Sequence, residues 1–258
     1  MKKLFIDKNV KVIKGSRAKS LIISKNDSAY IQDDAILKVD RERWNDAQSY
    51  ERKTWMELGL KSADDRNYEH FKRFDSFNSL KEYQKENKIN KVIELGCGPF
   101  TNMRTLLSQL PNLKEIHLLD PLLNDYLKHP NCQYSTGQLD KFKTVLHAIP
   151  IEELETNEVF DLVVMINVLE HCYDITIIFE KILSIMTCGS VFVFSDVYYF
   201  ENDVKKMVYE IYDAGHPIKL TFNYMNQFLS RFKKIFECEL HGLYGQPWRH
   251  DKYFIGVK

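Results

Sequence analysis

The sequence predicts an α/β protein organised around a doubly wound, mostly parallel sheet. From residue 90 onward, short apolar runs that are typical of buried strands alternate with longer segments of helical periodicity. The run "KVIELG" leads through a glycine turn into a helical segment, and a later run, "EIHLLD", ends on an acidic residue. Residues that follow strands in this way gather at the carboxyl edge of a parallel sheet, where such folds bind ligands.

The chain begins with an N-terminal extension, residues 1–88. Over residues 1–40, the apolar runs "LFI", "VKVI", "SLIIS", "SAYIQ" and "AILKVD" are separated by turn-forming "KGS" and "KND". This pattern predicts short strands or hairpins that form an appendage outside the main core. Over residues 41–88 the spacing becomes helical, and Ser62 with Asp65 fits a capping box that opens a second helix.

The remaining residues, 89–258, are expected to form the main domain. Strands are predicted in "KVIELG", "EIHLLD", "CQYST", "FDLVVMIN" and "SVFVFS", with helices in "MRTLLSQL" and "ITIIFEKILSIM". Residues 195–229, after the fifth strand, are interpreted as an insertion that forms a lid over the carboxyl edge. The tail "KKIFECELHG" and "KYFIGVK" is expected to pair as antiparallel strands. The intervening "GQPWRHD" is interpreted as a loop that contacts either substrate or a second subunit of a homodimer.

Composition argues against several classes of partner. The chain has 258 residues, with 36 lysines and arginines against 36 aspartates and glutamates, so its charge does not favour nucleic acid or an anionic membrane. No run approaches the roughly 18 apolar residues of a membrane span, and charged residues interrupt the N-terminal segment where a signal peptide needs an apolar stretch. The five cysteines show no paired spacing, which is typical of reduced thiols. We therefore expect a cytoplasmic protein.

The glycine turn "ELGCGPFT" constrains the ligand. Gly96 and Gly98 fit a turn that lets a ligand approach the backbone, but Thr101 stands where a dinucleotide fingerprint has its third glycine. Glu94, just before the turn, would repel a pyrophosphate and attract an amino or sulfonium group. Asp120, at the end of the next strand, is placed to accept both hydroxyls of a ribose, although it also fits a helix cap before Pro121. The pattern indicates adenosine with a positively charged tail.

"VIELGCGPF", "HLLDP" and "FDLVVMINVLEH" together resemble the class I S-adenosylmethionine-dependent methyltransferases over residues 89–258. The resemblance implies a seven-stranded Rossmann-like sheet, S-adenosylmethionine as cofactor and S-adenosylhomocysteine as product. It implies that the donor is held at its methionine end by Glu94, Gly96, Cys97 and Gly98, at its ribose by Asp120, at its adenine by Gln138 and Leu139, and near its methyl group by Asn167 and Val168. Cys97 is interpreted as a small filler of the turn and not as a nucleophile.

The helical part of the N-terminal extension is interpreted as a lid that excludes water from the site of methyl transfer. In "WNDAQSYERKTW", Gln48, Tyr50 and Trp55 are the candidates to face the donor, since aromatic faces stabilise a sulfonium. The alternative is an amphipathic helix that buries Trp44 and Trp55. This segment resembles methyltransferases of bacterial surface-polysaccharide clusters, which implies a sugar or sugar-phosphate-type acceptor and a role in capsule biosynthesis.

Two histidines are the candidate catalytic bases for a hydroxyl acceptor. His171 follows the fourth strand and is ranked above His216, whose position depends on the insertion; structural roles remain open for both. Further acceptor contacts are expected from the insertion, at Asp196, Tyr198, Tyr199 and Tyr224. The spacing of histidines and carboxylates does not favour a metal. N-methylation of an amino sugar or another small metabolite, and a nucleoside-binding module without catalysis, are the alternatives to O-methylation.

Overall fold

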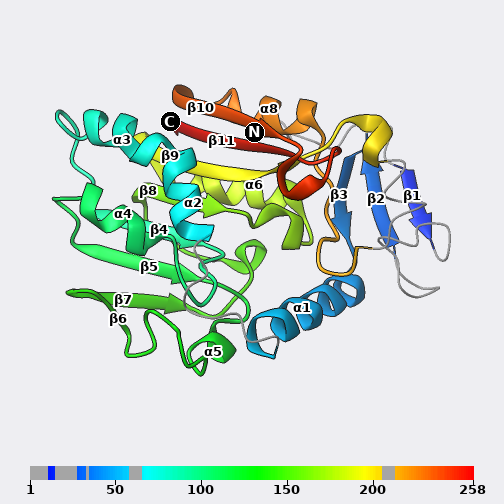
Figure 1. The fold of residues 1–258 in the computed structure, drawn as a ribbon, viewed down its shortest axis with the longest axis horizontal. Helices are drawn as coiled ribbons and strands as arrows, with labels where there is room; N and C mark the ends of the chain where they lie inside the picture. Colours follow the sequence, from blue (N-terminus) through cyan, green and yellow to red (C-terminus); the bar gives the residue numbers. More distant parts are fainter. Residues whose placement is uncertain (1–10, 15–27, 33–34, 58–65, 205–212) are drawn as a thin grey trace.

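The computed structural model describes residues 11–14, 28–32, 35–57, 66–204 and 213–258. The centre of this described part is an eight-stranded sheet with the order β10-β11-β9-β8-β4-β5-β7-β6 (Figure 1). In chain order its strands are β4 (Lys91–Leu95), β5 (Glu115–Leu119), β6 (Gln138–Leu139), β7 (Phe142–His147), β8 (Phe160–Ile166), β9 (Met186–Tyr198), β10 (Lys233–His241) and β11 (His250–Val257).

The middle of the sheet is parallel, which confirms the predicted fold class. β9, β8, β4, β5 and β7 run in the same direction, and β11 lies antiparallel between β10 and β9. β4, β5 and β8 are buried along almost their whole length, as expected of parallel strands that helices cover on both faces. The short β6 pairs antiparallel with β7 and adds an eighth strand to the seven-stranded arrangement expected from the sequence.

The third parallel strand lies further along the chain than the sequence predicted. The expected strand in "CQYST" is wrong, because residues 133–136 form turns and the strand is instead "FKTVLH", β7. The turns are bounded by Pro130 and by Gly137, whose φ of 74° suits glycine. Tyr134 within them is fully buried, and its hydroxyl donates a hydrogen bond of 2.5 Å to the carbonyl of Gly98. Residues 133–136 are therefore held by this contact with the glycine turn and not by pairing with a neighbouring strand.

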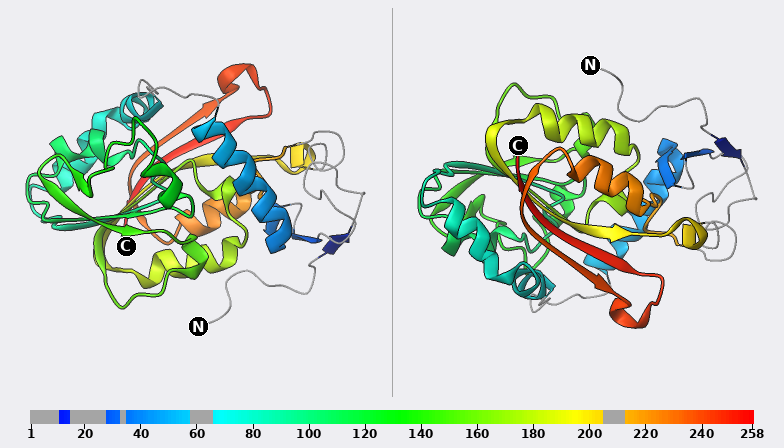
Figure 2. Two further views of the ribbon diagram at one scale, coloured as in Figure 1. Left: turned by 90° about the horizontal axis from the view of Figure 1, so that it is seen from below. Right: turned by 90° about the horizontal axis from the view of Figure 1, so that it is seen from above.

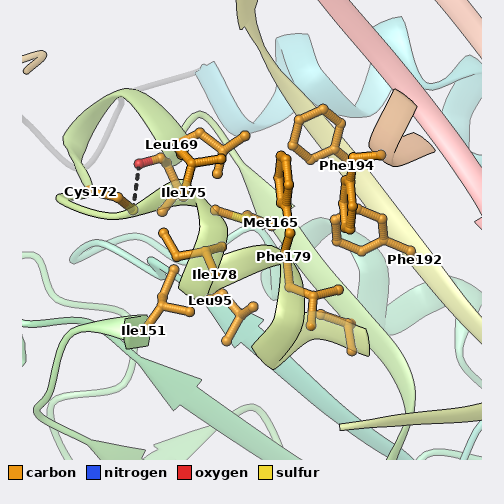
Figure 3. Packing of buried hydrophobic residues seen from close by; sticks show 14 of the residues in the cluster. Leu95, Ile151, Met165, Leu169, Cys172, Ile175, Ile178, Phe179, Phe192 and Phe194 are labelled. Carbon is orange, nitrogen blue, oxygen red and sulfur yellow. Dashed lines mark hydrogen bonds between the residues drawn. The ribbon is translucent and has the colours of Figure 1, made fainter. Parts of the chain in front are cut away.

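Helices cover both faces of the sheet (Figure 2). α6 (Ile175–Ser184) and α8 (Phe222–Leu229) lie on one face, and α2 (Arg66–Arg73), α3 (Asn78–Tyr83) and α4 (Met103–Leu106) lie on the other. Phe179 of α6 stacks on Phe228 of α8 with ring centroids 3.8 Å apart, and it packs beside Phe192 and Phe194 of β9 (Figure 3). α8 therefore belongs to the core, so the predicted lid is wrong for this part of the insertion.

The N-terminal extension contributes to the same core. β1 (Lys11–Lys14), β2 (Ser28–Gln32) and β3 (Ala35–Val39) form a three-stranded sheet. Most of β3 is buried, and Ala35 and Leu37 belong to the core cluster around α6 and α8. A bridge also pairs Ile36 with Lys219 of the insertion. The interpretation of residues 1–40 as an appendage is thus wrong for β3, because its apolar side chains find a partner surface in the insertion.

α1 (Arg41–Met56) follows β3 and confirms the first predicted helix. The runs "LFI" and "SLIIS" and the capping box of Ser62 and Asp65 lie outside the described residues. The next helical region is broken: α2 ends at Arg73, and residues 75–77 have positive φ values before α3 begins. None of the helices in the described ranges has the length and apolar character needed to cross a membrane.

Candidate active site

A cavity of about 510 Å³ lies at the carboxyl ends of β4, β5 and β8, where α1 forms one of its walls. In a doubly wound sheet this edge collects the segments that follow the strands. Those segments supply much of the lining, at residues 96–102, 120–121, 150–152, 166–168 and 170–172. The cavity therefore lies at the edge of the sheet where the sequence predicts the site.

Two glycines shape the turn after β4. Gly96 has a φ of 74° and Gly98 one of 55°, conformations that glycine adopts without strain. A Cβ on Gly96 would lie 2.5 Å from the side chain of Val168, so this glycine lets the loop after β8 pack against the turn. A Cβ on Gly98 would meet no atom within 4 Å. Gly98 lines the cavity, and the space beside it is open to a ligand.

Glu94 lies beneath this turn and outside the cavity lining. Its carboxylate accepts hydrogen bonds from the backbone N–H of Asn102 (2.9 Å), from the Asn102 amide (3.0 Å) and from the Thr101 hydroxyl. Burial raises the pKa of Glu94 to about 6, although these donors act in the opposite direction. Thr101, which stands where a dinucleotide fingerprint has its third glycine, thus helps Glu94 to hold the turn.

Asp120 follows β5 and lines the cavity. Its Oδ2 accepts a hydrogen bond from the backbone N–H of Gly98 (3.0 Å), and its Oδ1 accepts one from that of Leu122 (2.9 Å). Burial raises the pKa of Asp120 to about 7, and the carboxylates of Glu51 and Glu94 add to the effect. Each carboxylate oxygen still has a lone pair for a further donor. Asp120 both caps the turn after β5 and offers acceptors to the cavity, so the two interpretations of this residue are compatible.

The other residues that the sequence predicts to contact S-adenosylmethionine fall into two groups, those that line the cavity and those that do not. Cys97 lines the cavity, and burial raises the pKa of its thiol, as suits a filler of the turn. Asn167 and Val168 also line it, and Asp196 Oδ2 accepts the backbone N–H of Val168 at 2.8 Å, which fixes the loop after β8. Gln138 and Leu139 form β6 at the sheet edge and lie outside the lining. Residues 150–152, which follow β7, do line the cavity.

α1 forms a wall of the cavity through one face. Trp44 Nε1 and Gln48 Nε2 each donate a hydrogen bond of 3.0 Å to the carbonyl of His171. Further along, Trp55 packs edge-on against Phe100, with ring centroids 5.6 Å apart. Tyr50 also lines the cavity, with 51% of its surface exposed. The helix is thus tied to the site at both ends.

One part of the cavity lining holds two adjacent imidazoles. His171 and His216 have ring centroids 4.6 Å apart. His171 Nδ1 lies 3.1 Å from the carbonyl of Gly215, and burial lowers the pKa of His171 more than nearby carboxylates raise it. His216 Nδ1 lies 2.7 Å from Asp213 Oδ1, and carboxylates raise the pKa of His216 above its ordinary value although burial opposes them. The structure therefore brings together two residues that are 45 positions apart in the chain.

Several solved structures that this fold resembles are described as methyltransferases. The N-methyltransferase NodS from Bradyrhizobium japonicum, in complex with S-adenosylhomocysteine, matches with a TM-score of 0.55 and 15% identity, covering 83% of this chain and all of that one. A S-adenosylmethionine-dependent methyltransferase from Leishmania major matches with a TM-score of 0.55 and 11% identity, covering 84% and 85%. A third, a S-adenosylmethionine-dependent methyltransferase from Clostridium acetobutylicum, matches with a TM-score of 0.51 and 13% identity, and the match covers 72% of this chain and 92% of that one. The chain has the methyltransferase fold. No family model and no curated protein matches its sequence.

Within this methyltransferase fold, the four acceptor candidates from the insertion do not line the cavity. Asp196 supports the loop after β8, and Tyr199 donates a hydrogen bond of 2.9 Å to Glu170. Tyr198 donates to Glu239 at 3.1 Å, and Tyr224 is buried in the core beside α6. Asp196 and Tyr198 belong to β9, Tyr199 directly follows it, and Tyr224 belongs to α8, so core packing and internal hydrogen bonds use these side chains.

Several lining residues were not identified from the sequence. Glu51 lies on α1 with its carboxylate 3.7 Å from His171 Nδ1, and its spacing from Gln48 and Trp55 was the signal that placed it on the same helix face. Glu170 precedes His171 and is buried at the cavity wall. Other unexpected lining residues come from α2 and the β10–β11 connection: Arg66, Asn67, His70, Tyr244 and Arg249. The last of these lies in "GQPWRHD", the segment interpreted as a substrate- or subunit-contacting loop.

One group of side chains in the described ranges has the composition of a metal site. Ligand atoms of Glu115, His117 and Glu158 lie within 4.8 Å of one another. The group is at the amino end of β5, opposite the cavity, and Lys91 Nζ already lies 3.1 Å from Glu115 and 2.5 Å from Glu158. The lysine supplies the positive charge there, so the arrangement is a salt-bridge network.

Proposed function

We propose that this protein is a S-adenosylmethionine-dependent methyltransferase. The observation that carries the proposal is a single cavity that joins the glycine turn and Asp120 to a pair of imidazoles. Gly98 leaves open space for a ligand, and both oxygens of Asp120 retain acceptor capacity toward ribose hydroxyls. The residues present therefore fit the donor that the fold implies.

The donor site is assigned on this geometry. Asp120 would bind the ribose, the backbone of residues 96–98 would contact the methionine portion, and residues 150–152 would flank the adenine in place of Gln138 and Leu139. Glu51 offers a carboxylate to the positively charged amino or sulfonium group from the α1 side. Glu94 acts indirectly, by holding the turn.

We place a hydroxyl acceptor, of sugar or sugar-phosphate type, beside His171 and His216. The bound donor supplies an activated methyl group, so the chain has to orient the acceptor, exclude water and take the hydroxyl proton. α1 covers the site, and a neutral imidazole accepts a proton near neutral pH. The proposed role in bacterial capsule or surface polysaccharide synthesis, in the cytoplasm, rests on the resemblance of "WNDAQSYERKTW" to methyltransferases of surface-polysaccharide clusters. The proposal of a homodimer rests on the exposed β10–β11 connection.

N-methylation is the second candidate. Glu51 and Glu170 place carboxylates around the imidazole pair, which suits an acceptor that carries an amine. NodS, with 15% identity, is itself described as an N-methyltransferase. A nucleoside-binding module would share the donor site and show no turnover.

Calorimetry with S-adenosylhomocysteine tests the donor half. We expect wild-type protein to bind it and Asp120→Ala to bind roughly 10- to 150-fold more weakly, as the loss of charge-assisted hydrogen bonds predicts. The control is Glu158→Gln, at the opposite edge of the sheet. No binding by wild-type protein, or equal affinity in Asp120→Ala, would contradict the donor assignment.

A matched acceptor screen tests the acceptor half. Simple sugars, sugar phosphates and amino sugars of the same ring are supplied with S-adenosylmethionine, and release of S-adenosylhomocysteine is measured. Turnover with the hydroxyl compounds supports O-methylation, turnover that requires the amine supports N-methylation, and donor binding without any turnover supports the binding module.

A further inference from the structure

Two buried cations, Arg43 and Lys219, hold residues 213–219, the segment from which His216 lines the cavity. Arg43 of α1 is fully buried and donates hydrogen bonds to the backbone carbonyls of Asp213 (2.7 Å) and Ala214 (2.8 Å). Lys219, at the other end of the segment, is also fully buried, with Nζ 2.5 Å from Asp213 Oδ2. Burying a lysine is costly unless a carboxylate pairs with it. The ion pair therefore fixes the orientation of the Asp213 carboxylate.

Asp213 directs its other oxygen to the imidazole. Oδ1 lies 2.7 Å from His216 Nδ1, and a carboxylate in this position keeps the proton on Nδ1 and leaves Nε2 to accept another. His216 lines the cavity, and 37% of its side chain is exposed. His171 differs, because its Nδ1 faces the neutral carbonyl of Gly215 and the carboxylate of Glu51 is 3.7 Å away.

We infer that Asp213 is a positioning residue that orients His216 as the base of the methyl transfer, with Lys219 fixing Asp213. This inference rests on the proposed function. The acceptor oxygen forms a bond to the methyl carbon, and the bond from that carbon to sulfur breaks with its electron pair going to sulfur. The acceptor proton passes to Nε2 of His216. The ranking of His171 first, made from the sequence, is thereby reversed.

The charged groups around the two imidazole rings support the assignment of His216, and not His171, as the base. His216 faces Glu170 of η5 (Leu169–His171), Asp213 and Lys219, and the two carboxylates raise its pKa above the ordinary value against the effect of burial. His171 faces Glu51 of α1, Glu170 and His216, and its pKa is lowered, because burial outweighs the carboxylates. The ring with the higher proton affinity is the better acceptor of the hydroxyl proton.

The test uses a double variant. Asp213→Asn alone would leave Lys219 buried without its carboxylate, so Lys219→Met is added to remove both charges, which buried ion pairs often tolerate. Glu158→Gln, which removes a carboxylate from Lys91 at the far edge of the sheet, is the matched control.

With an acceptor from the screen, turnover of the double variant should fall about 10²-fold while S-adenosylhomocysteine affinity and the control stay unchanged. The acidic limb of its pH–rate profile should move to lower pH, because Asp213 no longer raises the pKa of His216. Loss of Lys219 acts in the opposite direction but is the smaller effect. Unchanged turnover, or an acidic limb that stays in place or moves to higher pH, would overturn the assignment.

A second measurement needs no acceptor. NMR titration of the imidazole Cε1–H signals should give His216 a midpoint at least about one pH unit higher in wild-type protein than in the double variant. Equal midpoints would overturn the role of Asp213. If wild-type protein does not bind S-adenosylhomocysteine, the proposed function fails, and this titration still decides whether Asp213 acts on His216.

Discussion

Replacing Asp120 by asparagine is expected to make the stability of the ligand-free protein less dependent on pH while weakening the donor site. Burial raises the pKa of Asp120 from 3.8 to about 7, so the folded state holds a proton that the unfolded state releases. The free energy of unfolding must therefore fall as pH rises between these two values. Integrated from pH 5 to pH 8, this one carboxyl group removes about 2.5 kcal/mol of stability.

Asparagine has no charge to bury, so the variant escapes this loss. It has its own cost, because the amide can accept from only one of the two backbone donors, Gly98 or Leu122, and leaves the other facing an NH₂ group. Such a loss is typically about 1–3 kcal/mol. We expect Asp120→Asn to be less stable than wild-type protein at pH 5 and to gain about 2.5 kcal/mol relative to it by pH 8.

Urea unfolding of both proteins at pH 5, 6, 7 and 8 measures this difference. Other buried carboxyl groups with raised pKa values, such as Glu94 and Asp196, are present in both proteins and largely cancel. Calorimetry on the same samples should show weaker S-adenosylhomocysteine binding by Asp120→Asn, and wild-type affinity that declines below about pH 7. A stability difference that does not vary with pH would refute the assigned protonation of Asp120.

The other predictions concern the turn, the lid and the base. Gly96→Ala should destabilise the fold by about 1–3 kcal/mol in denaturant unfolding, because its Cβ would meet the loop after β8 at 2.5 Å and φ is 74°. Tyr134→Phe removes the hydrogen bond to Gly98 and should cost about 1 kcal/mol by the same measurement. S-adenosylhomocysteine should slow hydrogen exchange in α1 as well as in the glycine turn, and protection of the turn alone would exclude α1 from the donor site. His216→Ala should lower turnover by about 10²- to 10⁴-fold, and His171→Ala by less.

Local sequence patterns determined the sheet and the edge at which the cavity lies. The apolar runs of β4, β5 and β8 identify parallel strands, and parallel strands bring their carboxyl ends to one edge whatever the connections between them. The glycine turn and Asp120 therefore had to meet, because both follow adjacent strands directly. The helical spacing of Gln48 and Trp55 likewise placed α1 correctly as a helix with one face toward other residues.

Contacts between distant segments were decided only by the tertiary structure. "CQYST" and "FKTVLH" are both short apolar runs, and burial of Tyr134 against the glycine turn decides between them. From the sequence, α8 is part of a polar insertion, and only the stacking of Phe228 on Phe179 of α6 shows that it belongs to the core. Asp213 and His216 gain their orientation from two cations, one of them in α1, about 170 positions away in the chain. Residue spacing encodes which face of one element is apolar. The hydrogen bonds of buried Arg43 to the carbonyls of Asp213 and Ala214 depend instead on which elements meet, and packing of the whole chain settles that.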